Sequence, residues 1–237
     1  MSQKGISIEA ISLTKLYLRG SEEIPAVKDV SLRINKGDFI SIIGPSGSGK
    51  TTLVNLLGCL DNPTSGEISL GGRPIFNNGK RLSERELTKI RREIFGYIFQ
   101  NFYLIPTLTV MENVMLPLTF YRKASSEDEG AKLLKLLGMD HRKHHLPGQI
   151  SGGEMQRVAI ARAMVNTPEI LLADEPTGNL DTKRSAEIVQ VLQELNRTVG
   201  LTIIMVTHNQ DLARYADRLF EMKDGLIAEI DCKSLPI

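Results

Sequence analysis

The first third of the chain is predicted to form mainly β-strands, because apolar and polar residues alternate along much of it. The stretches 6–13 and 30–34 alternate in this way, as strands with one buried face do. Residues 38–44, DFISIIG, are almost continuously apolar, which suits a strand buried on both faces. Residues 51–58 are predicted as a helix that ends at a glycine, and residues 66–72 as another strand.

The middle of the chain has mainly the pattern of helices. Residues 82–93 and 126–138 each begin with a capping box, in which a serine precedes a glutamate by three positions. Residues 94–100 are predicted as a short strand between them. Residues 101–121 are predicted as an apolar connecting stretch, because prolines interrupt them.

The last third alternates strands with helices. We predict helices at 151–165 and 182–200, strands at 169–175 and 201–208, and a hairpin that turns at an Asp-Gly pair within 218–230. Strands that alternate with helices imply crossover connections and a mainly parallel sheet. The predicted fold class is therefore α/β.

Composition and charge exclude several kinds of protein. A chain of 237 residues, 41% of them hydrophobic, can bury a sizeable core. Its net charge of +1 provides no overall attraction to nucleic acid or to anionic lipid. Cys59 and Cys232 fit neither a disulfide framework nor a zinc site, which favours a reducing cytosol. Apolar runs such as 202–206 are much shorter than a membrane span, so we expect membrane contact only through a partner, without direct insertion.

Residues 44–51, GPSGSGKT, match the phosphate-binding pattern G-x-x-x-x-G-K-[ST] at every fixed position, between a predicted strand and a predicted helix. Glycines let successive backbone N–H groups turn inward around an anion, and the helix N-terminus adds partial positive charge. Lys50 can reach the β- and γ-phosphates, and the Thr51 hydroxyl can ligate Mg²⁺. An ordinary glycine-rich turn is the alternative, but the full match with both flanks favours a nucleotide site.

The stretch 170–175, ILLADE, is an apolar strand that ends in two carboxylates. Ligands of open α/β sheets bind at the carboxyl ends of the strands. Asp174 would hold Mg²⁺ through its water shell, and Glu175 would polarise or deprotonate the water that attacks the γ-phosphate. A strand that ends in solvated acids is the alternative, but the phosphate-binding pattern at 44–51 favours a site.

The helix predicted from residue 151 begins with Ser151-Gly152-Gly153-Glu154. A capping box explains the serine and the glutamate, but not the glycines, each of which costs about 1 kcal/mol relative to alanine within a helix. Bare N–H groups at a helix start bind anions, yet the chain has a single phosphate loop. We therefore expect a head-to-tail dimer, in which this helix end lies over the γ-phosphate bound by the other subunit.

The ordered set of motifs resembles the ATP-binding subunit of an ABC transporter over essentially the whole chain. GPSGSGKT resembles the Walker A loop, ISGGE the family signature usually written LSGGQ, and ILLADE the Walker B strand with its catalytic glutamate. The resemblance extends to Gln100 in the Q-loop, GNLD at 178–181 in the D-loop, the switch histidine His208, and Tyr17 as the aromatic that stacks on adenine. Taken alone, His208 is more often a structural histidine and Tyr17 more often a packing residue.

This resemblance implies an ABC ATPase architecture. That architecture has a P-loop NTPase core with a mainly parallel sheet, an antiparallel β subdomain and an α-helical subdomain. A single domain would cover residues 1–237, with the helical subdomain inserted at about 101–158.

The resemblance also implies roles for individual residues. Glu175, His208 and Gln100 would be catalytic, while Thr51, Gln100 and Asp174 would bind Mg²⁺. Ser151 to Glu154 would contact the partner's ATP, and Asp181 the opposite subunit. The expected nucleotide-binding residues are Tyr17, Gly44, Pro45, Ser46, Gly47, Ser48, Gly49, Lys50, Thr51 and Thr52.

Two positions depart from the usual signature. Ile150 replaces leucine with almost no change in volume. Glu154 replaces glutamine and adds a negative charge near the partner's phosphates, so we expect it to weaken ATP-driven closure.

LGCLDNPTSGEI and the stretch from LTKIRRE to MENVMLPL resemble the branch that powers lipoprotein release and macrolide-type export. The expected partners are a second ATPase subunit, as a homodimer, and an integral membrane permease, with no nucleic acid. The chain would then lie peripherally on the cytoplasmic face of the cell membrane. The apolar residues of 102–110 suit a groove for a coupling helix of the permease, or are simply core.

Two rival functions remain. A soluble ABC-type ATPase acting on ribosomes would carry two cassettes, and one acting on DNA would carry a long coiled coil between Lys50 and Ser151, which are only about a hundred residues apart. A small-molecule P-loop kinase would leave the Ser-Gly-Gly-Glu helix start and His208 unexplained. Residues 141–145, HRKHH, are interpreted as a solvated basic loop rather than a metal or phosphate site.

Overall fold

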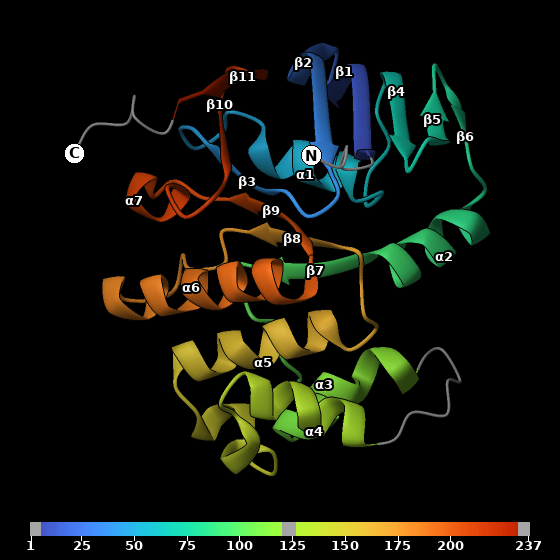
Figure 1. Ribbon diagram of the computed structural model, residues 1–237. Coiled ribbons are helices and arrows are strands. Elements are labelled where there is room, and N and C mark those ends of the chain that lie inside the picture. Colours follow the sequence, from blue (N-terminus) through green and yellow to red (C-terminus); the bar gives the residue numbers. More distant parts are fainter. Residues whose placement is uncertain (1–5, 120–126, 232–237) are drawn as a thin grey trace.

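The computed structural model of the chain describes residues 6–119 and 127–231, and stacks two sheets above a group of helices (Figure 1). The upper sheet is antiparallel, in the order β2-β1-β4-β5-β6. Its strands in chain order are β1 (Ile6–Arg19), β2 (Glu22–Asn35), β4 (Ser65–Leu70), β5 (Arg73–Asn77) and β6 (Lys80–Arg81). β1 is longer than predicted, because a bulge with Ser12 at a φ of 47° interrupts its alternation.

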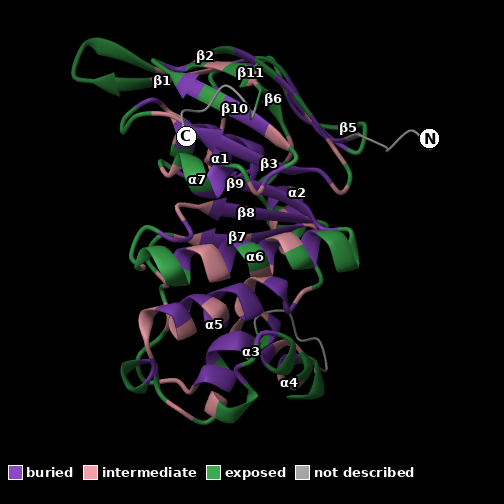
Figure 2. Cartoon of the chain, turned by 60° about the vertical axis from the view of Figure 1, so that its left-hand side comes forward, coloured by how far each residue is buried: buried purple, intermediate pink, exposed green. Residues whose placement is uncertain are grey.

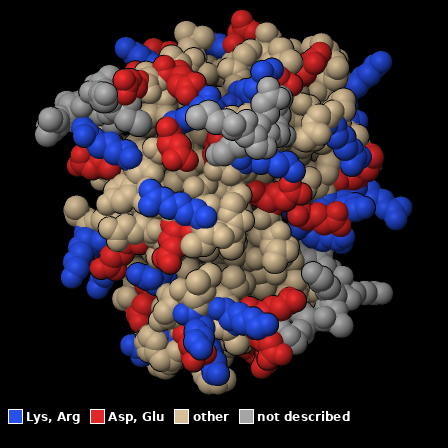
Figure 3. All heavy atoms as spheres, viewed as in Figure 1, with Lys and Arg blue, Asp and Glu red and all other residues tan. Residues whose placement is uncertain are grey.

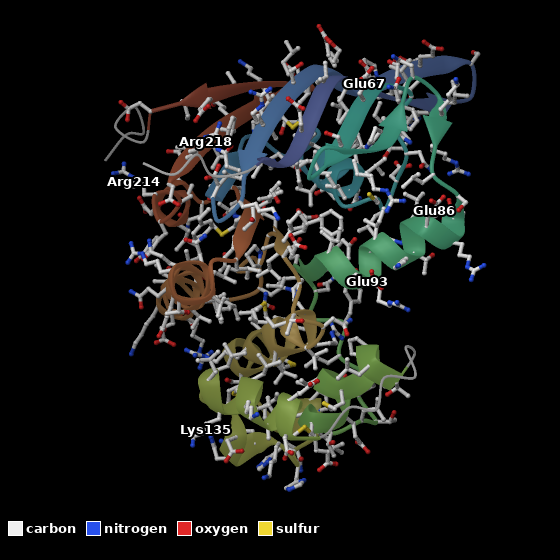
Figure 4. The ribbon with its side chains drawn as sticks, turned by 45° about the vertical axis from the view of Figure 1, so that its right-hand side comes forward. Glu67, Glu86, Glu93, Lys135, Arg214 and Arg218 are labelled. Atoms are coloured by element: carbon white, nitrogen blue, oxygen red, sulfur yellow. The ribbon has the colours of Figure 1, made fainter. Side chains whose placement is uncertain are left out.

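The central sheet is mainly parallel, in the order β11-β10-β3-β9-β8-β7, and only β11 runs antiparallel to its neighbour. Its strands are β3 (Phe39–Ile43), β7 (Phe95–Phe99), β8 (Ile170–Asp174), β9 (Thr202–Val206), β10 (Arg218–Lys223) and β11 (Leu226–Ile230). The predicted Asp224-Gly225 hairpin is confirmed, with both residues at positive φ. Arg218, labelled in Figure 4, links the two sheets, because its Nη1 donates to the Arg33 carbonyl on β2 at 2.8 Å.

The helices lie around and below the central sheet (Figure 1). Their bounds are α1 (Lys50–Leu57), α2 (Glu84–Ile94), α3 (Val110–Thr119), α4 (Glu127–Leu136), η1 (Asp140–Arg142), η2 (Pro147–Gln149), α5 (Gly152–Met164), α6 (Thr182–Val199) and α7 (Gln210–Ala213), where η1 and η2 are 3₁₀-helices. The capping box of α2 is confirmed, with Ser83 and Glu86 bonded reciprocally. The serine of the second predicted box, Ser126, lies outside the described residues.

The interpretation of 101–121 as a connecting stretch is wrong, because α3 occupies its second half. Thr109 and Glu112 form a capping box at its start: the Thr109 hydroxyl accepts from the Glu112 N–H at 3.2 Å, and Glu112 accepts from the Thr109 N–H at 2.7 Å. Pro117 lies near the C-terminal end of α3. A proline inside a helical pattern lowers the expectation of a helix, and here tertiary packing against α4 and α5 outweighs it.

Two large clusters of apolar side chains form most of the core, and the central sheet separates them, while a small third cluster joins Ile43, Ala213 and Leu219. Alternate residues of β8 enter opposite clusters, Ile170 and Leu172 facing the antiparallel sheet and α1, and Leu171 and Ala173 facing α5 and α6. Figure 2 shows the buried residues concentrated in these layers. The structure confirms the predicted α/β class with its parallel core, antiparallel sheet and helical layer.

The molecular surface is mixed in charge. Lysine and arginine are interspersed with aspartate and glutamate over the face shown in Figure 3, in keeping with the net charge of +1. None of the helices described within 6–119 and 127–231 combines the length and apolarity needed to cross a membrane.

Candidate functional site

The loop between β3 and α1 contains two glycines, Gly44 and Gly49, that no other residue could replace without displacing neighbouring atoms. Gly44 has a φ of 148°, and a Cβ there would lie 2.0 Å from the Met222 carbonyl oxygen on β10. Gly49 has a φ of 104°, and a Cβ there would lie 2.1 Å from the Ala26 carbonyl oxygen on β2. The loop therefore packs closely against both sheets, and its backbone path requires residues without a Cβ at these two positions.

Lys50 places its ammonium group inside this loop. Its Nζ donates to the carbonyl oxygens of Gly44 at 2.9 Å and Pro45 at 2.8 Å, and the residue is only 7% exposed. Gly49 at the N-cap of α1 provides no side-chain cap for the N–H groups of the first turn. The loop thus concentrates a cation and uncapped N–H groups in one place, as an anion site requires.

Two acidic residues lie at the carboxyl end of β8, Asp174 as its last residue and Glu175 directly after it. The Thr51 hydroxyl of α1 donates to Asp174 Oδ1 at 3.2 Å, which joins two of the three predicted magnesium ligands. Burial raises the pKa of Asp174, and the neighbouring charge of Glu175 adds to this effect. Glu175 itself has a φ of 50°, an unusual backbone conformation for a glutamate and one that often accompanies functional sites.

His208 follows β9 and contacts Glu175. Its Nδ1 lies 2.9 Å from Glu175 Oε2. Because an ionised carboxylate can only accept, Nδ1 carries the proton in this contact, which leaves Nε2 for another group. The pair joins the ends of two neighbouring strands, as expected for residues at the carboxyl edge of a parallel sheet.

A cavity of about 550 Å³ collects most of the predicted site residues from segments far apart in the sequence. It is lined by Tyr17, Ala26, Ser46, Gly47, Gly49, Lys50, Thr51, Thr52, Gln100, Glu175 and His208. Sequence reasoning missed Ala26, whose small apolar side chain carries no chemical signal. It also missed Lys15 and Asp61, which contact Tyr17 beside this cavity.

The Ser-Gly-Gly-Glu segment does not line this cavity. Its capping box is confirmed: the Ser151 hydroxyl accepts from the Glu154 N–H at 3.4 Å, and Glu154 accepts from the Ser151 N–H at 2.8 Å. A Cβ on Gly152 would lie 3.3 Å from Leu180 Cδ2, and one on Gly153 would lie 3.2 Å from Arg184 Cδ. Close packing within the chain is therefore a second reason for the two glycines.

Glu154 is not an isolated negative charge. Its Oε1 accepts from Arg142 Nε at 3.1 Å, and Arg142 Nη1 lies 3.2 Å from His145 Nε2. The bond from the Ser151 N–H, and then the Arg142 side chain, lower the pKa of Glu154. Within the basic stretch 141–145, Arg142 is thus held in an ion pair, whereas His141 and His144 are exposed. No cluster of metal-binding side chains occurs in the described part of the chain.

The segment after Gln100 is held by two neighbouring elements. Asn179 Nδ2 donates to the Gln100 carbonyl at 2.9 Å, and a Cβ on Gly178 would lie 2.8 Å from Gln100 Nε2. Arg162 of α5 donates to the carbonyl oxygens of Phe102 and Tyr103, at 2.7 and 2.6 Å. Asp181, predicted as a dimer contact, is the N-cap of α6 and accepts from the Arg184 N–H at 2.9 Å.

Comparison with protein families matches residues 27–178 to a model described as ABC transporter. The chain is 50% identical to the "Uncharacterized ABC transporter ATP-binding protein MJ0796" of Methanocaldococcus jannaschii, over 92% of this chain and 94% of the relative. It is 45% identical to the "Macrolide export ATP-binding/permease protein MacB" of Rhodopirellula baltica, over 94% of this chain. The alignment covers 32% of that relative, so the chain matches about a third of its length.

Solved structures are also similar to this chain. A dimeric post-hydrolysis state of the ATP-binding cassette MJ0796, bound to ADP and Pi, superposes with a TM-score of 0.85 and 44% identity, covering 96% of this chain and 100% of the other. The structure of cbiO1 from Clostridium perfringens, part of the transporter complex cbiONQ, gives a TM-score of 0.83 and 29% identity, covering 95% of this chain and 88% of the other.

Proposed function

Because the chain belongs to the ABC transporter family, as an ATP-binding subunit with ATPase activity, we propose that two copies clasp two ATP molecules between them and convert hydrolysis into work on a membrane partner. Closure of the dimer follows ATP binding, and reopening follows hydrolysis. The ribosomal or DNA-directed alternative receives no support from the family or from the similar structures.

We propose that the β3–α1 loop binds the triphosphate. Lys50 exchanges its contacts with the Gly44 and Pro45 carbonyls for the β- and γ-phosphates, and the first-turn N–H groups of α1 complete the cradle. The Thr51 hydroxyl and the Asp174 carboxylate place two oxygen atoms 3.2 Å apart, and oxygen atoms are the ligands that Mg²⁺ prefers. Gln100 supplies a further oxygen from the cavity wall. Bound Mg²⁺ would neutralise phosphate charge at this position.

We assign the proton-transfer role to Glu175. Its carboxylate accepts the proton of the attacking water, while His208, bonded to it through Nδ1, orients it and offers Nε2 to the γ-phosphate.

The main support for a dimer is the position of the Ser-Gly-Gly-Glu segment at the start of α5. This segment does not line the nucleotide cavity of its own chain, so we propose that its N–H groups contact a γ-phosphate bound by a second chain. The related MJ0796 cassette is itself dimeric in its structure with ADP and Pi. We propose a homodimer on this basis, with Asp181 at the contact.

The test is a Glu175→Gln variant. It should bind ATP, lose about two to four orders of magnitude in hydrolysis rate, and accumulate as a dimer in sedimentation with magnesium-ATP. Glu221→Gln, at an exposed position of β10, is the matched control and should turn over normally. A Glu175→Gln protein that stays monomeric at saturating ATP, or that hydrolyses at the normal rate, would refute the proposal.

The membrane partner is proposed to dock on the segment after Gln100. Tyr103 is 63% exposed and Ile105 is 37% exposed, whereas Leu104 packs on the core. The MacB relatives are named as ATP-binding and permease proteins in one chain. We propose a separate permease of this type, which would hold the chain peripherally at the cytoplasmic face of the membrane. We further propose one domain over 1–237, with a helical subdomain at about 101–158, whose end falls inside α5.

A further inference from the structure

The side chains of Lys15, Tyr17 and Asp61 contact one another at the edge of the nucleotide cavity, where Lys15 and Asp61 support Tyr17. Lys15 and Tyr17 are two residues apart on β1, so they lie on the same side of that strand. Asp61 comes from the turn after α1, and its two carboxylate oxygens accept from Lys15 Nζ at 2.8 Å and from the Tyr17 hydroxyl at 2.9 Å. We call these three residues the Tyr17 clamp.

The clamp leaves the tyrosine ring accessible while its support is more enclosed. Tyr17 is 42% exposed and lines the nucleotide cavity, whereas the Lys15 and Asp61 side chains are 13% and 30% exposed. Lys15 Nζ lies over the ring, 4.9 Å from its centroid. Because the ammonium group covers one face of the ring, a flat ligand in the cavity can stack only on the other.

The protonation states of the clamp agree with this geometry. Burial alone would raise the pKa of Asp61, but hydrogen bonds from Lys15, Tyr17 and the Asn62 backbone hold that pKa below its usual range. Burial, and then the bond to Asp61, raise the pKa of Tyr17. The carboxylate is thus an ionised acceptor and the phenol a protonated donor at neutral pH.

Asp61 is tied to the same helix that carries the phosphate loop. The N–H groups of Leu60 and Asp61 donate to the Asn55 carbonyl at 2.8 and 3.2 Å, which folds the turn back onto α1. Lys50 begins this helix of eight residues, so one short rigid element sets the distance between the phosphate loop and the clamp.

We propose that Asp61 and Lys15 are positioning residues that hold the Tyr17 ring, with one free face, as a preformed platform for the adenine base of ATP. This inference rests on the proposed nucleotide site and assigns two further residues to it. Without the clamp, an exposed tyrosine would sample several rotamers and would have to be ordered when the nucleotide binds. The clamp acts on the base alone and leaves the triphosphate and the proton transfer untouched.

The test compares ATP with inorganic tripolyphosphate, which has no base. Asp61→Ala should raise the KM for ATP and its dissociation constant about tenfold, because base–aromatic stacking is largely lost. The value of kcat at saturating ATP and the dissociation constant of tripolyphosphate should not change. The matched control is Glu9→Ala, which removes the ion pair between Glu9 on β1 and Arg33 on β2. It should change none of these quantities.

Two milder variants keep the test decisive if Asp61→Ala folds poorly. Tyr17→Phe keeps the ring but loses the bond to Asp61, so it should weaken ATP binding in the same direction. Asp61→Asn keeps an acceptor and should recover part of the loss.

Three outcomes would refute the proposed role of the clamp: an equal loss of affinity for ATP and for tripolyphosphate in these variants, a fall in kcat alone, or an unchanged affinity for ATP. A wild-type protein that binds neither ligand would instead refute the nucleotide site itself.

Discussion

The two hydrogen bonds from Arg162 provide a quantitative test of how the signature helix is joined to the segment after Gln100. Arg162 lies on α5, ten positions after Gly152, and its two terminal nitrogens donate to the successive carbonyls of Phe102 and Tyr103 at 2.7 and 2.6 Å. Burial lowers the pKa of this guanidinium, although it remains a cation. Tyr103 has a φ of 46°, so the bonded segment is held in an uncommon backbone conformation.

The proposed perturbation is Arg162→Lys, which keeps the charge but not the planar fork. One ammonium group on a flexible stem cannot reproduce two parallel bonds to adjacent carbonyls. A hydrogen bond from a charged donor contributes about 1.5–3 kcal/mol, and we expect lysine to keep one of the two. The free energy of unfolding should therefore fall by about 2 kcal/mol, a substantial part of the roughly 5–15 kcal/mol typical of a folded domain.

The assay is urea denaturation followed by circular dichroism, with Arg197→Lys as the control. Arg197 is an exposed residue near the end of α6, so its replacement should stay within about 0.5 kcal/mol of the wild type. If Arg162→Lys unfolds within the same margin as the control, the two bonds do not stabilise the native state and the reasoning fails.

The remaining predictions concern charge at the site and the partner surface. Burial raises the folded pKa of Asp174 above its unfolded value, so its ionisation destabilises the free protein as the pH rises through that range. Asp174→Asn should therefore raise the melting temperature of the nucleotide-free protein at pH 7, not at pH 3, while reducing the further rise that magnesium-ATP produces. Calorimetry in which Asp174→Asn melts lower at pH 7 would contradict this. In the hydrolysis-dead background, Arg142→Gln should weaken ATP-driven dimerisation and Glu154→Gln should strengthen it, with the double variant near the starting value, because net charge at the start of α5 decides the effect. Sedimentation in which both single variants weaken the dimer would assign the pair a purely structural role. Replacing Tyr103 and Ile105 with serine should preserve ATPase activity of the isolated subunit and abolish co-purification with the permease, and loss of both would indicate a role in the core.

Local patterns in the sequence predicted those parts of the protein that depend on neighbouring residues. The capping boxes at Ser83 and Ser151 and the Asp224-Gly225 hairpin all occur where the residue types indicated, because their hydrogen bonds span only a few positions. The buried strands were predictable from apolar runs, and β8 indeed divides its residues between two cores. The β3–α1 loop was equally recognisable, since its glycines and Lys50 form one continuous motif.

The tertiary structure alone decided which distant side chains meet. Nothing local to Asp61 indicates that it accepts from Tyr17, 44 positions earlier, because the contact requires the turn after α1 to pack on β1. Arg142 belongs to a basic stretch that was predicted to be solvated. It pairs with Glu154 only because η1 packs beside the start of α5 in the folded chain. α3 contains Pro117, a residue whose presence had favoured an irregular connection over a helix. Short-range hydrogen bonding and periodicity are properties of a segment, whereas ion pairs and close approaches depend on how segments pack, which the sequence determines only through the whole fold.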